Sequence, residues 1–137
     1  MSQDNRPTPP RDEKIARWLA HSEIRAVVER YFYGLDARDA QALSACFTPD
    51  AYYEANTGGG RRIVFEGAEA IGTTLARLIG RFEASLHQGS NPAITVEGDS
   101  AQVDVFAIAR MVHVPVDGQK VVFCLLYTSD AADDLLC

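Results

Sequence analysis

The chain contains four stretches in which apolar residues recur every three or four positions, the period of an amphipathic helix. These stretches are residues 12–20, 22–39, 40–47 and 67–84. In the second, Ser22 is the predicted N-cap, and in the third Asp39 takes that role. His21 lies in the polar junction between the first two stretches, so we interpret it as a solvated boundary residue.

Elsewhere apolar residues recur at every second position, as expected of β-strands with one buried face. The predicted strands are residues 51–55, 61–65, 86–99, 100–114 and 120–123, joined by turn-rich segments such as NTGGG, EGDS and PVDGQ. Helices followed by a run of antiparallel strands predict an α+β domain. A sheet that wraps a helix is strongly curved, and its concave face is a natural pocket.

Composition narrows the class of protein. A chain of 137 residues with 47% hydrophobic residues and 23% charged residues is expected to form one globular domain. The net charge of −6 and the lack of a basic patch argue against nucleic acid as a partner. No apolar run is long enough for a membrane span and no signal peptide is recognisable. The three cysteines show neither metal nor disulfide spacing, so a cytoplasmic location is expected.

The two ends of the chain differ from its centre. Residues 1–11 are polar and proline-rich, so we expect a flexible arm, and residues 12–123 form the predicted domain. Residues 124–134 of the segment 124–137 match the translation of a transposase-end sequencing adapter, and we interpret that segment as non-native read-through. The domain is then expected to be truncated after Phe123.

Two of the three histidines lie in predicted strands. Alternation places Ala107, Ala109 and Met111 on the face of the strand that carries His113. The two alanines leave room either for a ligand or for a helix side chain, and the sequence does not decide between them. On the preceding strand, Asn91 follows His87 by four residues and would share its face, although Gly89 and Pro92 favour a bulge there.

The stretch YFYGLDARD offers partners for such a histidine. An imidazole is the side chain best suited to move protons at neutral pH, and a carboxylate on its other nitrogen stabilises the protonated ring. Asp36 is the candidate carboxylate, and the Tyr31 hydroxyl could polarise a carbonyl oxygen. This set suits proton abstraction beside a carbonyl group without a cofactor. The histidine and carboxylate spacings do not match a zinc motif, so no metal is expected.

The segments IRAVVERYFYGLDARDAQALSACFTPDAYYE, FEGAEAI, HQGSNPAITVEGDSAQV and VFAIARMVH together resemble the SnoaL-like family of the NTF2-like superfamily. The resemblance covers residues 13–123. It implies an α+β cone in which a curved antiparallel sheet wraps around the N-terminal helices and one long helix. It also implies a homodimer through the outer face of the sheet.

The resemblance further implies site residues. Dehydratases of this family pair a helix-end aspartate with a strand histidine, and these positions match Asp36 and His87. Tyr31 matches a tyrosine of the bile-acid dehydratase, and His113 matches a second histidine of scytalone dehydratase. A strand tyrosine of the latter aligns with Ala55, two residues after Tyr53, which lies on the same strand face.

From these residues we expect a cofactor-independent lyase or isomerase, of the dehydratase or polyketide cyclase type, acting on a small hydrophobic cyclic carbonyl compound. The predicted catalytic residues are Asp36, His87, Tyr31 and His113, and the predicted substrate contacts are Tyr53, Asn91, Ala107, Ala109 and Met111. Two alternatives remain open at this point. One is a non-catalytic ligand-binding domain, and the other is the small (beta) subunit of an aromatic-ring-hydroxylating dioxygenase.

Overall fold

The computed structural model of the chain describes residues 10–57, 60–113, 118–127 and 135–136. Three helices and six strands follow one another in these residues. They are α1 (Arg11–Ala37), α2 (Ala40–Ser44), β1 (Tyr52–Thr57), β2 (Arg61–Glu66), α3 (Ala68–Ile79), β3 (Ala84–Glu97), β4 (Ser100–His113), β5 (Val121–Tyr127) and β6 (Leu135–Leu136). The predicted α+β class is confirmed.

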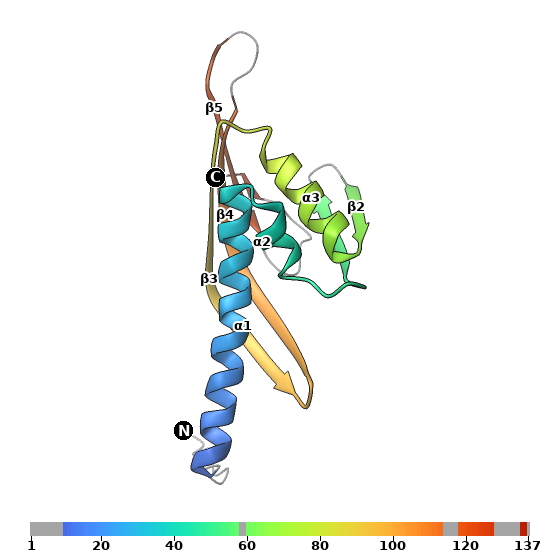
Figure 1. Cartoon of the computed structure of the whole chain (residues 1–137). Helices are drawn as coiled ribbons and strands as arrows, with labels where there is room; N and C mark the ends of the chain where they lie inside the picture. The colour runs from blue at the N-terminus through green and yellow to red at the C-terminus, as the bar shows by residue number, and fades with distance from the viewer. Residues whose placement is uncertain (1–9, 58–59, 114–117, 128–134, 137) are drawn as a thin grey trace, which may run out of the picture.

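The strands form two antiparallel sheets. β1 and β2 make a hairpin, while β3, β4, β5 and β6 form a four-stranded sheet in that order. Figure 1 shows α1 running lengthwise beside the larger sheet, with α2, α3 and the β1–β2 hairpin gathered around its C-terminal half. The end of α1 and the start of β3 therefore lie close together, which brings distant parts of the sequence into contact.

The first helix differs from the prediction. α1 is one continuous helix of 27 residues, so the predicted break between residues 20 and 22 is wrong. Ser22 does not act as an N-cap, and His21 lies inside the helix rather than at a boundary. No proline or glycine interrupts the sequence between Arg11 and Gly34, so nothing in the backbone chemistry forces a break.

The core lies where the three helices meet. Leu35, Leu43, Ile71 and Leu75 are its buried residues. Gly34 allows α1 to approach α2 closely, because a β-carbon there would lie 3.0 Å from Cγ of Leu43. The helices can therefore pack backbone to side chain at this point, and the α1 C-terminus is fixed in place.

The junction between α1 and α2 is held by two kinds of cap. Arg38 takes the left-handed conformation with φ of 56°, which ends α1. The Asp39 carboxylate then accepts hydrogen bonds from the backbone N–H groups of Gln41 and Ala42, at 3.0 and 2.9 Å. The prediction that Asp39 caps the second helix is confirmed.

β3 and β4 form the long hairpin of the sheet. His87 lies opposite Ala109, and Gly89 lies opposite Ala107. The register shifts between Ser90 and Ala93, which confirms the irregularity predicted from the neighbouring glycine and proline. Residues 114–117, at the predicted PVDGQ turn, lie outside the described residues.

The last strands extend beyond the predicted domain. β5 continues to Tyr127, four residues past Phe123, and pairs with β4 over its whole length. Cys124 is disulfide-bonded, so the expectation drawn from cysteine spacing is wrong for this residue. No helix of the described chain is long and apolar enough to cross a membrane. Residues 1–9 of the predicted arm and residues 128–134 of the predicted tail lie outside the description.

Candidate active site

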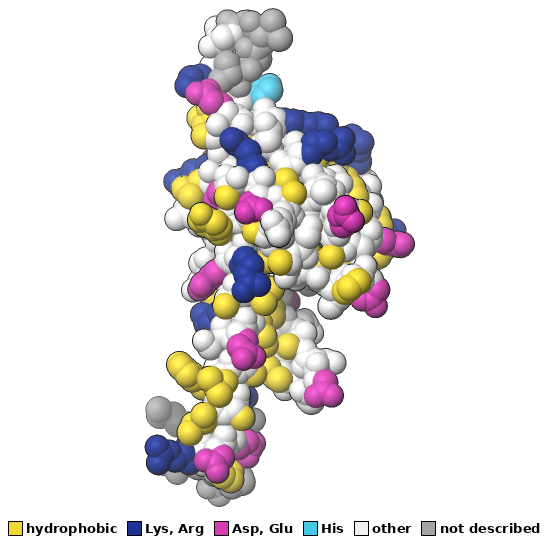
Figure 2. Space-filling view, viewed as in Figure 1, with side chains coloured by type: hydrophobic (Ala, Val, Ile, Leu, Met, Phe, Trp, Pro, Cys, Tyr) yellow, Lys and Arg dark blue, Asp and Glu magenta, His cyan; other side chains and the backbone are white. Residues whose placement is uncertain are grey.

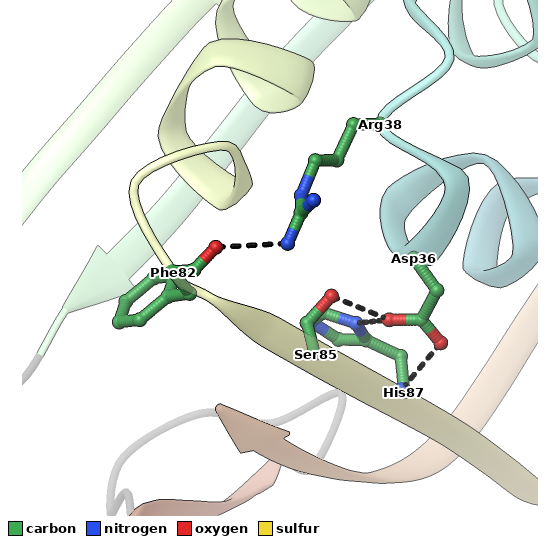
Figure 3. Close-up of polar contacts among 5 residues, drawn as sticks. All are labelled: Asp36, Arg38, Phe82, Ser85 and His87. Atoms are coloured by element: carbon green, nitrogen blue, oxygen red, sulfur yellow. Dashed lines mark hydrogen bonds and ion pairs between the residues drawn. The ribbon is translucent and has the colours of Figure 1, made fainter. Parts of the chain in front are cut away.

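Asp36 and His87 meet between the end of α1 and the start of β3. The Nδ1 atom of His87 lies 2.7 Å from Oδ1 of Asp36, and the histidine side chain is only 6% exposed (Figure 3). The Asp36 side chain is 23% exposed. A half-buried carboxylate thus fixes the orientation of an enclosed imidazole.

Three donors converge on the Asp36 carboxylate. The Ser85 hydroxyl donates to Oδ1 at 2.9 Å, and the backbone N–H of His87 donates to Oδ2 at 2.8 Å. An ionised carboxylate has only acceptors, so the third contact requires Nδ1 of His87 to carry the proton. In neutral His87 the lone pair that can act as a base is then on Nε2.

Ser85 was not predicted from the sequence, although a signal was present. It lies two residues before His87 on β3, so strand alternation places both side chains on the same face. Residues with hydroxyl groups are common in strands. The role of the Ser85 hydroxyl can be recognised only once the position of Asp36 is known. Figure 3 shows both side chains directed toward the aspartate.

Arg38 adds a second link, between the end of α1 and the turn that leads into β3. Its guanidinium donates to the backbone carbonyl oxygen of Phe82 at 2.8 Å (Figure 3) and to that of Glu83 at 3.0 Å. Asp36 lies two residues earlier and binds Ser85 and His87, so the end of α1 is held both to the turn before β3 and to the first residues of the strand. We refer to Asp36 and His87 together as the dyad. Its geometry therefore depends on the path of the backbone as well as on these two side chains.

Tyr31 and Tyr53 lie together in an aromatic cluster. Their hydroxyl oxygens are 3.2 Å apart, and the Phe47 ring packs edge-on against both tyrosine rings. Phe65 stacks on Tyr53 with ring centroids 6.0 Å apart. Tyr31 and Asp36 are five residues apart on α1, about 140° around the helix at 3.6 residues per turn. The tyrosine pair thus faces α2 and β1, while the aspartate faces β3.

The small residues of the sheet face are covered. Ala107, Ala109 and Met111 are 5%, 0% and 6% exposed. A β-carbon added at Gly89 would clash with the Phe32 ring, so this helix side chain packs directly on the strand opposite Ala107. The space beside Gly89 and Ala107 is therefore filled by a helix side chain. This is one of the two alternatives, ligand or helix side chain, that the sequence left open.

Two predicted residues are not brought to the dyad. His113 packs edge-on against Phe82, with ring centroids 6.2 Å apart. It lies four residues along β4 from Ala109, the residue opposite His87, which is roughly 13 Å at strand spacing. Asn91 is exposed and takes a left-handed conformation with φ of 52° at the bulge.

The described residues contain no group of three or more His, Cys, Asp or Glu side chains placed to hold a metal ion. What the arrangement offers is acid–base chemistry. One imidazole has a fixed tautomer, and one carboxylate can stabilise its protonated form. Two phenolic hydroxyls lie 3.2 Å apart, that of Tyr31 on the same helix as the carboxylate and that of Tyr53 on β1.

Comparison with known proteins agrees with this architecture. Residues 16–133 match the SnoaL-like domain. The chain is 32% identical over 109 residues to the uncharacterized protein Rv2910c of Mycobacterium tuberculosis, covering 79% of this chain and 71% of that protein. The uncharacterized protein Mb2934c of Mycobacterium bovis matches to the same extent.

Solved structures share the fold at lower identity. A provisionally assigned scytalone dehydratase of Novosphingobium aromaticivorans superimposes with a TM-score of 0.66 at 19% identity, over 90% of this chain and 83% of that one. Hexachlorocyclohexane dehydrochlorinase LinA-type3 of Novosphingobium barchaimii gives 0.60 at 19% identity, over 90% and 85%. A dehydratase-like member of the NTF2-like family from Streptomyces avermitilis gives 0.57 at 17% identity, over 84% and 89%. The predicted NTF2-like fold is confirmed.

Proposed function

The chain belongs to the SnoaL-like domain family, and from this premise we propose that it is a cofactor-independent lyase or isomerase acting on a small hydrophobic cyclic carbonyl compound. The observation that carries the proposal is the contact between Nδ1 of His87 and Oδ1 of Asp36 at 2.7 Å. The names of two fold neighbours, a dehydratase and a dehydrochlorinase, also refer to eliminations.

The proposed chemistry begins at His87. Its Nε2 atom removes a proton from the carbon next to the substrate carbonyl, and Asp36 stabilises the imidazolium that forms. The resulting enolate expels a leaving group from the adjacent carbon, or takes a proton back at another position. The same imidazolium can protonate the leaving oxygen, so a single histidine serves as base and then as acid.

The aromatic cluster supports the choice of substrate class. Tyr31 and Tyr53 combine an apolar ring with a hydroxyl that can donate to the oxygen of an enolate. Phe47 and Phe65 pack against these rings and supply apolar surface suited to a cyclic compound. Charged side chains that would recognise a phosphate or an ammonium group are not among the residues of this cluster.

The test is a panel of cyclic β-hydroxy and β-halo ketones, followed by ultraviolet absorption of the conjugated product and by deuterium uptake from D₂O. We expect His87→Ala and Asp36→Asn to lower turnover on the order of 10²–10⁴-fold, the usual range for a lost general base. His21→Ala is the matched control, since that histidine lies on α1 away from the dyad. Equal turnover by all three variants and the parent would reject the assignment.

The same contacts also favour a second candidate, a non-catalytic ligand-binding domain. All three hydrogen bonds to Asp36 come from β3, so the carboxylate could serve only to attach α1 to the sheet. In that case Asp36→Asn would lower the unfolding midpoint, and bound cyclic ketones would be recovered unchanged from the parent protein and from both variants.

A further inference from the structure

Phe32 of α1 lies beside the dyad, on the face of β3 that carries His87. A β-carbon on Gly89 would overlap the Phe32 ring, so the ring rests directly on the strand backbone at that residue. His87 and Gly89 are two residues apart on β3 and therefore face the same side of the sheet. On α1, Phe32 and Asp36 are four residues apart and share a helix face. The phenyl ring thus occupies the position next to the imidazole along the strand.

The same ring borders the tyrosine pair. Tyr31 and Phe32 pack edge-on, with ring centroids 5.5 Å apart. Around α1, Phe32 lies about 100° from Tyr31 and about 40° from Asp36, so it lies between the tyrosine and the aspartate. In the proposed reaction the substrate brings its acidic carbon within roughly 3–3.5 Å of Nε2 of His87. If its carbonyl oxygen also reaches the Tyr31 hydroxyl, the substrate lies against the Phe32 ring.

Beyond Phe32 the face of the hairpin remains apolar. Ile94 and Val103 lie opposite each other, and Val105 follows on β4, on the same face as Ala107. The side chains of Ile94, Val103 and Val105 are only partly buried. Figure 2 shows hydrophobic side chains between the N-terminal half of α1 and the free end of the β3–β4 hairpin. Phe32 therefore separates the dyad from a further stretch of apolar surface.

We propose that Phe32 is a specificity-determining residue, which limits how far a substrate can extend along β3 and so restricts the site to single-ring carbonyl compounds. This inference rests on the proposed function, because it takes the dyad as the place where the substrate binds. Gly89 and Ala107 leave space on the sheet, and the phenyl ring fills it. A smaller side chain at position 32 opens that space to a second ring of the substrate, with apolar surface beyond it.

A purely structural role for Phe32 predicts a different result. Loss of packing alone would lower the stability of the domain and weaken the binding of small and large ligands alike. Loss of a size limit instead raises the affinity for the larger ligand relative to the smaller one, because specificity is a difference between two affinities. The ratio of two dissociation constants therefore distinguishes the two roles.

The experiment titrates the protein with cyclohexanone and with 1-decalone, which differ by one fused saturated ring and carry no leaving group. Amide NMR shifts give both dissociation constants, and the shift of the Gly89 amide reports binding beside the dyad. We expect the parent to bind the single-ring ketone more tightly. Phe32→Ala and Phe32→Leu should each change the ratio about ten-fold or more in favour of the two-ring ketone, since even one methylene in an apolar pocket can be worth that much.

Phe82→Leu is the matched control, because the Phe82 ring packs on His113, away from Gly89. It should keep the parent's ratio. Urea unfolding followed by circular dichroism checks that each variant is folded during the titration. Phe32→Leu keeps most of the apolar packing, so the test does not depend on the alanine variant.

The outcomes separate this inference from the proposed function. A ratio that changes as expected supports the size limit, even if the parent turns over none of the hydroxy and halo ketones and the lyase assignment is rejected. An unchanged ratio in both variants overturns the size limit, whatever the turnover. Tighter binding of the two-ring ketone by the parent, or binding of neither ketone, also overturns it.

Discussion

His87 and Asp36 are 51 residues apart in the sequence, yet two atoms of the histidine bind two oxygens of the aspartate. The ring Nδ1 contacts Oδ1 at 2.7 Å, and the backbone N–H donates to Oδ2 at 2.8 Å. The carboxylate therefore fixes the strand backbone and the ring at the same time. Orientation of the imidazole cannot change unless the end of α1 moves relative to β3.

Ser85 should act as a positioning residue for this dyad. Ser85→Ala removes one of the two hydrogen bonds to Oδ1 of Asp36, with a cost of about 1 kcal/mol for such a bond. Once a substrate is identified, we expect kcat to fall roughly five- to ten-fold with KM unchanged, because substrate contacts are not altered.

Ser90→Ala is the control for that experiment, since Ser90 lies exposed on the same strand. Ser85→Thr keeps the hydroxyl and should recover most of kcat, which a purely steric effect would not explain. Parent-like kcat in Ser85→Ala would show that the hydroxyl does not position the aspartate.

Gly89 should be intolerant of any side chain. A β-carbon at this position would clash with the Phe32 ring, so Gly89→Ala should lower the free energy of unfolding by about 1–3 kcal/mol, the usual cost of overpacking. Urea unfolding followed by circular dichroism measures this change. In a Phe32→Ala background the obstacle is removed, and the same glycine substitution should then cost much less. Equal costs in both backgrounds would mean that the ring is not the obstacle.

The sequence predicted the parts of this molecule that depend on local pattern. Strand alternation and turn residues identified the β3–β4 hairpin and its bulge, and the short polar side chain of Asp39 identified a helix cap. The break before Ser22 was predicted wrongly, because an N-cap residue in a helix interior has the same local sequence as one at a helix start.

The arrangement of the site depended on information that is not local. Resemblance to a family suggested that Asp36 faces His87, but the role of Ser85 follows only from the approach of α1 to β3. Whether the space beside Ala107 is open or filled likewise depends on a side chain from another element. Phe32 of α1 packs on Gly89, the residue of β3 opposite Ala107. Small residues in a strand do not reveal whether a ligand or a helix fills the space above them.

Cys46 should react slowly with alkylating agents in the folded protein. Burial raises the pKa of its thiol, and the positive charge of Arg30 offsets this only in part. Because the folded state holds the proton more tightly, this group's contribution to stability is present below the ordinary thiol pKa and is lost as the pH rises through the raised value.

Iodoacetamide labelling at pH 8, read by peptide mass mapping, tests the cysteine prediction. Residue 46 should be labelled several-fold more slowly in the native protein than in urea, and the difference should narrow as the pH increases. Cys46→Ser identifies the peptide signal. Native labelling as fast as that of the unfolded chain would contradict the protection described.

Arg38 offers a test of how the end of α1 is fixed, because its backbone and its side chain contribute separately. Its φ of 56° favours glycine over alanine by roughly 1 kcal/mol, while its guanidinium binds the carbonyl oxygens of Phe82 and Glu83. Arg38→Ala loses the side-chain bonds and keeps the backbone strain, whereas Arg38→Gly loses the bonds but relieves the strain. Unfolding free energies from urea titration should therefore place the alanine variant below the glycine variant by about 1 kcal/mol.

Arg81→Ala, at an exposed position of the turn before β3, is the control and should stay within about 0.5 kcal/mol of the parent. If the alanine and glycine variants are equally stable, the left-handed cap does not contribute strain, and the fixing of α1 against β3 rests on the side chains of Asp36 and Arg38 alone.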